Sequence, residues 1–380
     1  MLVKNKIKII HYIPGFDTGG IESRLLDWYE NMDRDKIEFI VIRMTTNNSD
    51  KVKELQKING KFHTIPNFNL KNIIKYFKKM VEILKKEKPD IVHVHCMNTG
   101  LFCLMIAKIC KIKTRILHSR STDFLPNEKN IFIKKIIKKL TPIFATDYFA
   151  CSYEAGIWGN GKRNAEKTIV IKNGIELPNF YFNQKTREDI REKLGLENKK
   201  IIGTIGRLSP QKNLLFLLDV FNEISKKDLT NKYVLMLIGD GQMLEEINNR
   251  IKKYKIENKV ILLSSKSDVW NYYMAFDVFV ATSFYEGFGT TAVEAQATGL
   301  ITLLSTGFPE SVVLSNYAYR LSLDKEPTYW ADMILSLNSR TRTQKDAENI
   351  EQKGYSAKSV AKNLEKLYID KFSTRTDNER

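Results

Sequence analysis

Short runs of β-branched and aromatic residues alternate with longer stretches of helical periodicity along the first half of the chain. The pattern predicts helices near residues 21–31, 51–58, 70–87, 99–110 and 129–140, and strands at 7–13, 38–43, 61–65, 90–95, 114–118, 148–152 and 168–172. Strands that alternate with helices in this way favour a parallel sheet with helices on both faces. We therefore expect a doubly wound α/β domain over residues 1–173.

The alternation stops at Asn173-Gly174 and resumes near residue 201. Residues 174–200 hold turn signals and a short charged helix, so we expect an interdomain linker there. Strands are then predicted at 201–205, 233–238, 260–263, 278–281 and 301–304, with helices near 212–227, 242–254, 267–275 and 290–298. This predicts a second doubly wound domain over residues 201–355, followed by a helix at 356–380 that packs back near the first domain.

A length of 380 residues is enough for two domains of this kind. The ligands of open parallel sheets sit beyond the carboxyl ends of the strands. We therefore expect the chemistry in a cleft between the carboxyl edges of the two sheets.

The formal net charge of +17 is concentrated in the first half of the chain. Residues 1–173 carry 32 Lys and Arg against 17 Asp and Glu (net +15), whereas residues 174–380 carry 29 against 27 (net +2). Such an asymmetry suggests an anionic partner: nucleic acid, an anionic membrane surface or a phosphorylated substrate. Composition alone leaves these three open.

The cysteines and the hydropathy pattern bear on the compartment. Cys96, Cys103 and Cys110 recur every seven residues, which predicts buried positions on one helix rather than a disulfide or a zinc site. A reducing compartment fits this usage. The sequence has neither a signal-peptide core nor a run of about 18 apolar residues, so we expect a cytoplasmic protein that does not cross a bilayer.

The most specific group of candidate functional residues is Glu286-Gly-Phe-Gly-Thr-Thr-Ala-Val-Glu294, which follows a predicted strand and opens a helix. Its glycines let the backbone approach a ligand, and the helix N-terminus near Thr290 presents free N–H groups to an anion. The pattern predicts a phosphate-binding turn with a carboxylate on either side. An ordinary turn and N-cap is the alternative.

Two further turns follow the first strand of each domain. Gly206-Arg-Leu-Ser-Pro-Gln-Lys-Asn213 places Arg207 and Lys212 at a carboxyl end, where a guanidinium and an ammonium can bind a diphosphate. In the first domain, Gly19 and Gly20 form a turn whose amides can meet phosphate. Neither GxGxxG nor GxxxxGK[ST] occurs, so dinucleotide and P-loop interpretations lose their main support.

Together, the EX7E pattern at Glu286 and Glu294, the GRL..QKN segment, the Gly19-Gly20 turn and Asn173-Gly174 resemble the retaining GT-B glycosyltransferases of family four (group 1). The resemblance runs from the first strand to the terminal helix. Residues 151–159 further resemble the branch that assembles bacterial capsule, exopolysaccharide and O-antigen repeats. The resemblance implies an α/β GT-B fold, in which two doubly wound, Rossmann-like domains face each other across a cleft.

The resemblance also implies a role for each motif. Arg207 and Lys212 would bind the donor diphosphate and stabilise the departing nucleotide, and Glu286 would hold hydroxyls of the donor sugar. Glu294 would bind the nucleotide ribose. Sugar and phosphate would be lined by Gly287, Phe288, Gly289 and Thr290, with Gly19 and Gly20 near the phosphate. Fixed cations stabilise the charge that develops on a departing diphosphate, so this chemistry needs no metal or other cofactor.

His118 ends a predicted strand of the first domain and is followed by Ser119 and Arg120. In the family that the sequence resembles, a histidine at this kind of position contacts the donor sugar, so we expect His118 to be catalytic. The capsule branch often continues with His-Ser-His, whereas Arg120 stands here in place of the second histidine. A histidine that only satisfies hydrogen bonds at a strand end is the alternative.

Two other patterns resemble metal sites. His93 and His95 alternate on one strand face, but no third ligand stands at a suggestive spacing, and His95 fits the acceptor side better. Asp33-Arg34-Asp35 spells DxD in a turn after a predicted helix, far from a carboxyl edge. We therefore expect no metal.

Residues 129–140 form a basic amphipathic helix, with apolar Ile133, Ile136, Ile137 and Leu140 opposite Lys134, Lys135, Lys138 and Lys139. Residues 70–86 follow a similar pattern. Such helices can lie on an anionic membrane surface. The alternative is that both pack on the sheet and expose their lysines to water.

These features predict a retaining, metal-independent hexosyltransferase. It would move a sugar from a nucleotide-sugar, UDP-sugar by default, to a glycan or lipid-linked oligosaccharide at the inner face of the cell membrane. One alternative is a GT-B enzyme without transfer activity, such as a nucleotide-sugar 2-epimerase. A basic nucleic-acid-binding protein is disfavoured, because aromatic residues are not interleaved with the basic ones.

Overall fold

The computed structural model describes residues 6–16, 20–44, 50–69, 71–125 and 129–377. The chain divides into two compact units. The first comprises Met1–Gly174 together with Tyr355–Arg380, and the second comprises Ile175–Gly354. The chain therefore leaves the first unit once and returns to it for its last helix.

The first unit is built on a parallel sheet that has seven strands among the described residues. In spatial order they are β3 (Lys61–Thr64), β2 (Ile37–Arg43), β1 (Ile7–Tyr12), β4 (Ile91–Val94), β5 (Thr114–Ser119), β6 (Asp147–Ala150) and β7 (Ile169–Val170). The strand order reverses between β1 and β4, where His11 is in register with His93. The carboxyl edge at such a switch point is where ligands of doubly wound sheets bind.

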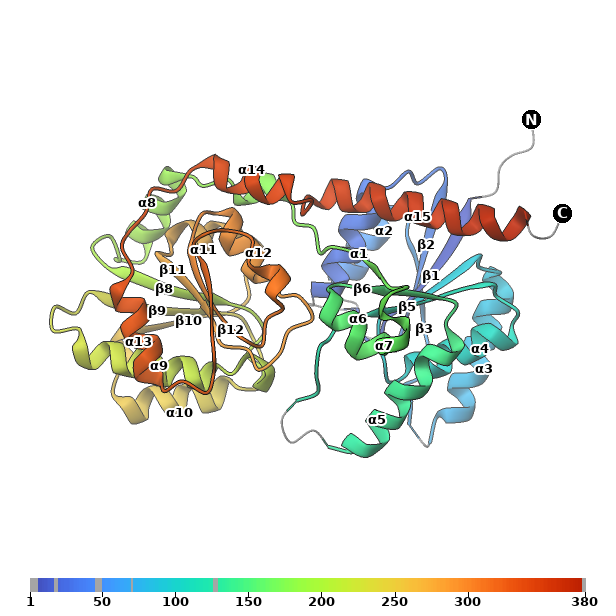
Figure 1. Ribbon diagram of the computed structural model, residues 1–380, viewed down its shortest axis with the longest axis horizontal. Coiled ribbons are helices and arrows are strands. Elements are labelled where there is room, and N and C mark those ends of the chain that lie inside the picture. Colours follow the sequence, from blue (N-terminus) through green and yellow to red (C-terminus); the bar gives the residue numbers. More distant parts are fainter. Residues whose placement is uncertain (1–5, 17–19, 45–49, 70, 126–128, 378–380) are drawn as a thin grey trace. The chain divides into compact units, whose positions relative to one another are not determined.

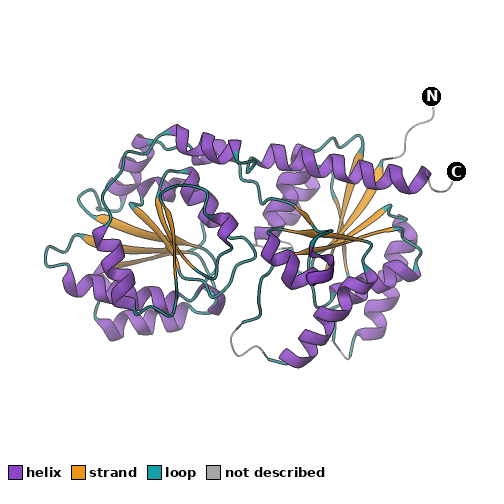
Figure 2. Cartoon of the chain, viewed as in Figure 1, coloured by secondary structure: helices purple, strands orange, loops and turns teal. Residues whose placement is uncertain are grey.

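Helices cover both faces of this sheet (Figures 1 and 2). Alternate strand residues point to opposite faces, so Ile9 and Ile10 belong to different apolar clusters. On one face, α1 (Gly20–Asn31), α2 (Asp50–Lys57) and α15 (Ala357–Asp377) pack in the Ile9 cluster, and α15 lies along α1. On the other face, α3 (Ile73–Glu87) and α4 (Gly100–Ile109) pack in the Ile10 cluster. The remaining helices of the unit are α5 (Ile131–Leu140), η1 (Thr141–Phe144), α6 (Tyr153–Asn160) and α7 (Lys162–Ala165).

The second unit repeats this topology. Within the described part of the chain its six parallel strands are, in spatial order, β10 (Val260–Leu263), β9 (Tyr233–Ile238), β8 (Lys200–Ile205), β11 (Val278–Ala281), β12 (Ile301–Ser305) and β13 (Ala318–Leu321). Its helices are η2 (Leu177–Phe180), α8 (Gln184–Lys193), η3 (Pro210–Lys212), α9 (Leu214–Lys227), α10 (Leu244–Tyr254), η4 (Glu257–Lys259), α11 (Trp270–Ala275), α12 (Thr290–Ala297), η5 (Glu310–Val312), α13 (Pro327–Ser336) and α14 (Gln344–Gln352). Here the switch point lies between β8 and β11.

The segment that we expected to be a linker, residues 174–200, differs from that expectation. From Ile175 onward it belongs to the second unit, where α8 packs on α11. Arg187 and Arg191 of α8 form ion pairs with Asp277, at 2.5 and 3.2 Å, and donate to backbone carbonyls at the end of α11. These ion pairs explain why a strongly charged helix is part of a folded unit.

The predicted class, two doubly wound parallel sheets, is confirmed. The prediction that three cysteines share one helix was wrong: Cys96 precedes α4 and Cys110 is its C-cap residue, which leaves Cys103 on the helix. All four cysteines are free thiols. Asp33 and Asp35 lie in the turn after α1, where Asp33 pairs with Lys36 at 2.8 Å. None of the helices in the described ranges is both long and apolar enough to cross a membrane.

Candidate functional site

The switch point of the second sheet brings together residues from two predicted motifs. Lys212 closes the turn η3 after β8, and Glu286 lies in the loop between β11 and α12. The Lys212 Nζ atom lies 2.6 Å from Glu286 Oε1, and the Ser283 hydroxyl donates to the same oxygen at 2.8 Å. Glu286 is almost completely buried. A cation and a carboxylate separated by 74 residues in the sequence therefore form one pair.

Backbone and side-chain hydrogen bonds hold the loops that carry this pair. Gln211 accepts from the Phe284 amide and donates through Nε2 to the Tyr285 carbonyl, both at 2.9 Å. The Glu286 amide donates to the Gly307 carbonyl at 2.9 Å. The loops after β8, β11 and β12 are thus tied to one another, which fixes the position of Glu286.

Gly289 is the N-cap residue of α12, and its conformation explains the glycine in the motif. Its φ angle is +94°, and a Cβ atom there would lie 2.3 Å from Cε1 of Phe308. A side chain would be both strained and blocked. Gly289 also brings no side chain to cap the helix, so the first N–H groups of α12 can bind an anion.

Arg207, Lys212, Ser283 and Thr291 line one small cavity of about 10 Å³, room for roughly one water molecule. The structure therefore brings the two predicted cations to the beginning of α12. Gly287 and Phe288, which follow Glu286 in the sequence, are buried, and Thr290 is the first residue of α12. Larger cavities lie at the opposite, amino edges of the sheets; one of 240 Å³ in the second unit is lined by residues including Arg187 and Asp277. We do not assign function to these, because ligands of such sheets bind at the carboxyl edge.

Glu294, the second carboxylate of the motif, lies one turn into α12 and is half-buried. The fully buried Tyr273 hydroxyl donates to Glu294 Oε2 at 2.8 Å. Burial raises the pKa of Tyr273 well above its usual value, and the adjacent Glu294 charge adds to that rise. Tyr273 therefore stays a hydrogen-bond donor and orients the carboxylate. Sequence analysis did not predict this partner, because nothing in the sequence distinguishes Tyr273 from other aromatic residues of a buried helix.

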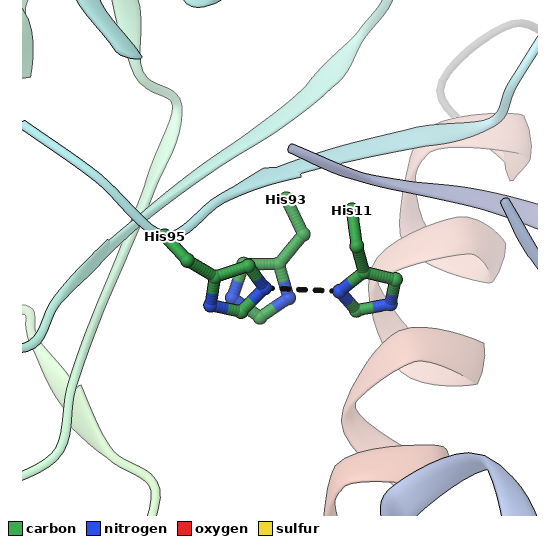
Figure 3. A group of neighbouring side chains, drawn as sticks. All are labelled: His11, His93 and His95. Carbon is green, nitrogen blue, oxygen red and sulfur yellow. Dashed lines mark hydrogen bonds between the residues drawn. The ribbon is translucent and has the colours of Figure 1, made fainter. Parts of the chain in front are cut away.

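The switch point of the first sheet gathers four buried histidines. His11 lies on β1, His93 lies on β4, His95 follows β4, and His118 lies on β5. His11 Nδ1 lies 3.0 Å from His95 Nε2, and His93 Nε2 lies 3.0 Å from His118 Nδ1 (Figure 3 shows the first pair). The predicted residue His118 is therefore one member of a larger cluster.

Residues of three other segments surround the histidines. The Trp28 ring of α1 stacks on His118, with centroids 6.1 Å apart. The Tyr368 hydroxyl of α15 lies 2.7 Å from His93 Nδ1, and the Arg120 guanidinium contacts His95 and lies over Trp28. Burial lowers the pKa of His11 to about 3, and the nearby Arg120 charge adds to this effect.

The other three imidazoles behave in the same way. Burial holds the pKa values of His93, His95 and His118 well below their usual range, and their cationic neighbours contribute. The cluster is therefore neutral at physiological pH. Nitrogens of His11, His93 and His95 lie within 4.8 Å of one another, close enough for one metal ion. Our sequence argument that no third ligand accompanies His93 and His95 was wrong, because His11 reaches them from the neighbouring strand β1.

The glycine turn of the first unit is the least informative prediction. Gly20 begins α1 and is exposed, with no atom within 4 Å of where a Cβ would be. Gly19 lies outside the described residues. The candidate residues thus fall into two groups: Arg207, Lys212, Glu286 and the start of α12 in the second unit, and His118 and Gly20 in the first.

Comparison with known proteins identifies the family. Residues 18–178 match the description "Glycosyltransferase Family 4", and residues 186–357 match "Glycosyl transferases group 1". The chain is 26% identical over 383 residues to the putative glycosyltransferase EpsF of Bacillus subtilis, with 98% of each chain covered. It is 29% identical over 251 residues to the UDP-Gal:alpha-D-GlcNAc-diphosphoundecaprenol alpha-1,3-galactosyltransferase of Escherichia coli, with 62% of each covered.

The fold is also found among solved structures. The crystal structure of Anabaena HepE in complex with UDP and glucose superposes with a TM-score of 0.78 at 20% identity, covering 95% of this chain and 99% of HepE. This similarity confirms the predicted GT-B architecture. The two sequence matches span both units of the chain, and the protein belongs to the group 1 glycosyltransferases of family four.

Proposed function

We propose that the protein transfers a hexose, with retention of anomeric configuration, from a UDP-sugar to a growing, lipid-linked bacterial surface glycan. The Escherichia coli relative is named for a UDP-Gal donor and a diphosphoundecaprenol acceptor, and HepE was crystallised with UDP and glucose. Other relatives are named for capsular polysaccharide biosynthesis. These names support the donor and acceptor classes that we propose.

The observation that carries the proposal is the Lys212–Glu286 pair at the switch point of the second sheet. Breaking the bond between a sugar and a diphosphate develops negative charge on the phosphate and positive charge on the anomeric carbon. A site for this reaction needs a cation and an oxygen acceptor a few ångströms apart, and this pair supplies both at 2.6 Å.

Each predicted site residue of the second unit has a role in the proposed mechanism. Lys212 and Arg207 bind the diphosphate and stabilise the negative charge of the departing UDP, with the N–H groups of α12 beside them. Glu286 accepts hydrogen bonds from sugar hydroxyls. Glu294, oriented by Tyr273, accepts from the ribose. The backbone from Gly287 to Thr290 lines the sugar and phosphate, and no step requires a metal.

In the first unit, His118 contacts the donor sugar. Its ring stacks on Trp28 and is hydrogen-bonded to His93, and its Nε2 atom is buried without a hydrogen-bond partner among the described residues. Because buried polar atoms are normally satisfied, this nitrogen suits a ligand oxygen. Gly20, at the start of α1, remains a proposed contact for the donor phosphate.

We also propose that α5 binds an anionic membrane surface, which brings the enzyme to a lipid-linked acceptor at the cytoplasmic face. None of its residues is buried, and Phe132, Ile133 and Ile136 are 73%, 57% and 44% exposed. Exposed Lys135 and Lys139 accompany them, whereas Lys138 lies 4.6 Å from the Trp158 ring. Apolar side chains this exposed next to lysines are typical of helices that lie in a lipid interface.

The test is a panel of nucleotide-sugars, including UDP-glucose, UDP-galactose, UDP-GlcNAc and GDP-mannose. A true donor at about 100 times its Kd should add about 2.7 kcal/mol to the unfolding free energy and raise the Tm. Product analysis with and without a lipid-linked acceptor then identifies the reaction. Transfer only when acceptor is present supports the proposal, and an epimerised sugar without acceptor identifies a 2-epimerase. Stabilisation by nucleic acid but by no nucleotide-sugar would refute the proposal.

A further inference from the structure

The hydrogen bonds within the histidine cluster have a direction. A neutral imidazole carries one proton, so one of its nitrogens donates and the other accepts. In a chain of imidazoles, the tautomer of one ring therefore determines that of the next. Two such chains start near Arg120 and Tyr368.

Arg120 determines the direction of the first chain. A guanidinium can only donate, and its Nε atom lies 3.3 Å from His95 Nδ1. His95 Nδ1 is therefore the acceptor, and the His95 proton sits on Nε2. From there it is donated to His11 Nδ1, 3.0 Å away. The proton of His11 must then reside on its own Nε2.

Tyr368 and Arg120 together determine the direction of the second chain. An Arg120 terminal nitrogen lies 3.5 Å from His118 Nδ1, so a proton on Nδ1 would meet a cationic N–H group. His118 Nδ1 therefore accepts from His93 Nε2 at 3.0 Å, and His93 Nδ1 accepts from the Tyr368 hydroxyl at 2.7 Å.

The two directions differ in where the chain leaves a proton without a partner. In the reverse direction His93 would donate to the Tyr368 oxygen, and the buried hydroxyl proton would need a different acceptor. Among the residues that the structure describes, no second hydrogen-bond partner of this hydroxyl is found. In the assigned direction the proton without a partner lies instead on His118 Nε2 at the carboxyl edge, where a ligand oxygen can accept from it.

Both chains end at buried nitrogens, His11 Nε2 and His118 Nε2, that have no hydrogen-bond partner within the described ranges. By the argument above, each of these nitrogens carries a proton. A donor without a partner is an expected feature of a site that a ligand oxygen completes.

We propose that Arg120 and Tyr368 are positioning residues that fix His118 in its Nε2–H tautomer, so that His118 donates a hydrogen bond to an oxygen of the bound nucleotide-sugar and does not act as a base. The identity of that oxygen rests on the proposed function. The tautomer itself follows from the contacts within the first unit. Arg120, which departs from the histidine frequent in the capsule branch, thereby acquires a function in this chain.

The competing interpretation is a metal site at His11, His93 and His95. Two observations favour the hydrogen-bonded chains. His11 and His95 already bond to each other, as do His93 and Tyr368, and the Arg120 guanidinium contacts His95 in place of a compensating carboxylate. A cation at this position would meet another cation in a buried environment.

The direct test is ¹⁵N NMR of the full chain labelled at histidine, at neutral pH without ligand. The chain has five histidines, and His63, which pairs with Glu87, serves as a reference outside the cluster. Correlations between ring nitrogens and carbon-bound protons distinguish the two tautomers. We expect Nε2–H signals for all four cluster histidines. An Nδ1–H signal for His118 would overturn the proposal.

A pair of matched variants tests the role of Tyr368. Tyr368→Phe removes the donor to His93, whereas Tyr76→Phe removes one member of a buried hydroxyl pair, Tyr12 and Tyr76 at 2.9 Å, on the opposite face of the same sheet. We expect Tyr368→Phe to change the His93 and His118 signals and to lower sugar transfer about tenfold or more, the size typical of partners that orient a functional histidine. Tyr76→Phe should leave both readouts unchanged.

The outcomes separate the proposal from its alternatives. Unchanged histidine signals in Tyr368→Phe, or an equal loss of transfer in Tyr76→Phe, would reduce Tyr368 to a structural role. Stoichiometric Co²⁺ binding that His11→Gln abolishes would replace the chains by a metal site. If the tautomers are as proposed but no nucleotide-sugar is used by the wild type, the proposed function fails and the tautomer assignment stands.

Discussion

The two switch points have the same topology and opposite chemistry. In both sheets the strand order reverses next to the first strand of the unit, and candidate residues gather at the carboxyl edge there. In the second unit this edge carries ions: Lys212 paired with Glu286, and the exposed Arg207. In the first unit it carries four neutral imidazoles that are almost completely buried.

The difference shows how burial determines what a switch point can do. Lys212 retains contact with solvent, so its charge is available to a departing diphosphate. The histidines have lost that contact, and their lowered pKa values leave them as neutral donors and acceptors. One edge can stabilise charge, and the other can orient a substrate through directed hydrogen bonds.

Acid should affect the first switch point most strongly. The folded pKa values of the four histidines lie below the unfolded value of about 6.5, so the unfolded chain takes up protons that the folded chain does not. The stability that the four histidines contribute is complete well above pH 6.5 and falls as the pH drops. At pH 5.5 the expected loss is about 1.4 kcal/mol per imidazole, or about 6 kcal/mol if all four stay neutral.

Urea unfolding between pH 7.5 and 5 measures this loss. Carboxylates also titrate in part of this range, so the informative quantity is the difference between the wild type and His118→Gln. The variant should lose about 1.4 kcal/mol less stability per pH unit. Equal slopes would mean that His118 is protonated in the folded protein, and the contrast between the two edges would disappear.

Charge at the second switch point should decide the rate of transfer. Glu286→Gln and Lys212→Ala should each lower turnover about 10²- to 10³-fold, or about 3 to 4 kcal/mol, because each removes an electrostatic contact at the reacting centre. The matched control is Lys227→Ala, which breaks the surface ion pair with Asp332 in the same unit. Steady-state kinetics on variants whose Tm values match that of the wild type check this prediction. Near-normal turnover in either site variant would remove the assignment.

A smaller effect is expected on membrane binding by α5, the helix of the basic first unit that we propose lies on an anionic surface. Replacing Lys135 and Lys139 by Gln should weaken binding to anionic vesicles by about 2 kcal/mol, roughly 30-fold, at about 1 kcal/mol per lysine. Lys252→Gln with Lys253→Gln on α10 makes the same charge change on another helix and should leave binding unchanged. Vesicle co-sedimentation checks both. Equal binding by the α5 variant would favour lysines that only face water.

The smallest expected effect is that of chelation. Arg207, Lys212 and the N-terminus of α12 supply the positive charge for the diphosphate, so EDTA should leave transfer unchanged. Assays with and without EDTA, followed by Mg²⁺ or Mn²⁺, check this. Loss of transfer that either ion restores would contradict a metal-independent second switch point.

The sequence predicts most of the fold, because its βα alternation is a local pattern. Strands such as β1 and β9 are short, mostly apolar runs and were found to within a residue or two. The edge strand β13, Ala-Tyr-Arg-Leu, was missed because four residues, three of them partly exposed, carry too little periodicity. The short helix α14 was missed for a similar reason, since its residues are mostly polar.

The site residues show where local reasoning ends. Lys212 and Glu286 were predicted from motifs, but their direct pairing depends on the adjacency of β8 and β11, which the sequence does not state. Tyr368 lies 275 residues from His93 and reaches it only because α15 returns to the first unit. His11 could have been predicted, because it lies near the end of a strand that a doubly wound topology places beside the strand of His93.

The most direct test of the contrast between the two edges is UDP binding measured by calorimetry on the full chain. UDP lacks the sugar, so its affinity should depend on the second switch point alone. We expect Arg207→Ala and Lys212→Ala to weaken UDP binding about tenfold or more, and His118→Gln to change it less than about twofold. Wild-type UDP affinity in both cation variants, or its loss in His118→Gln, would contradict the division of roles between the two sheets.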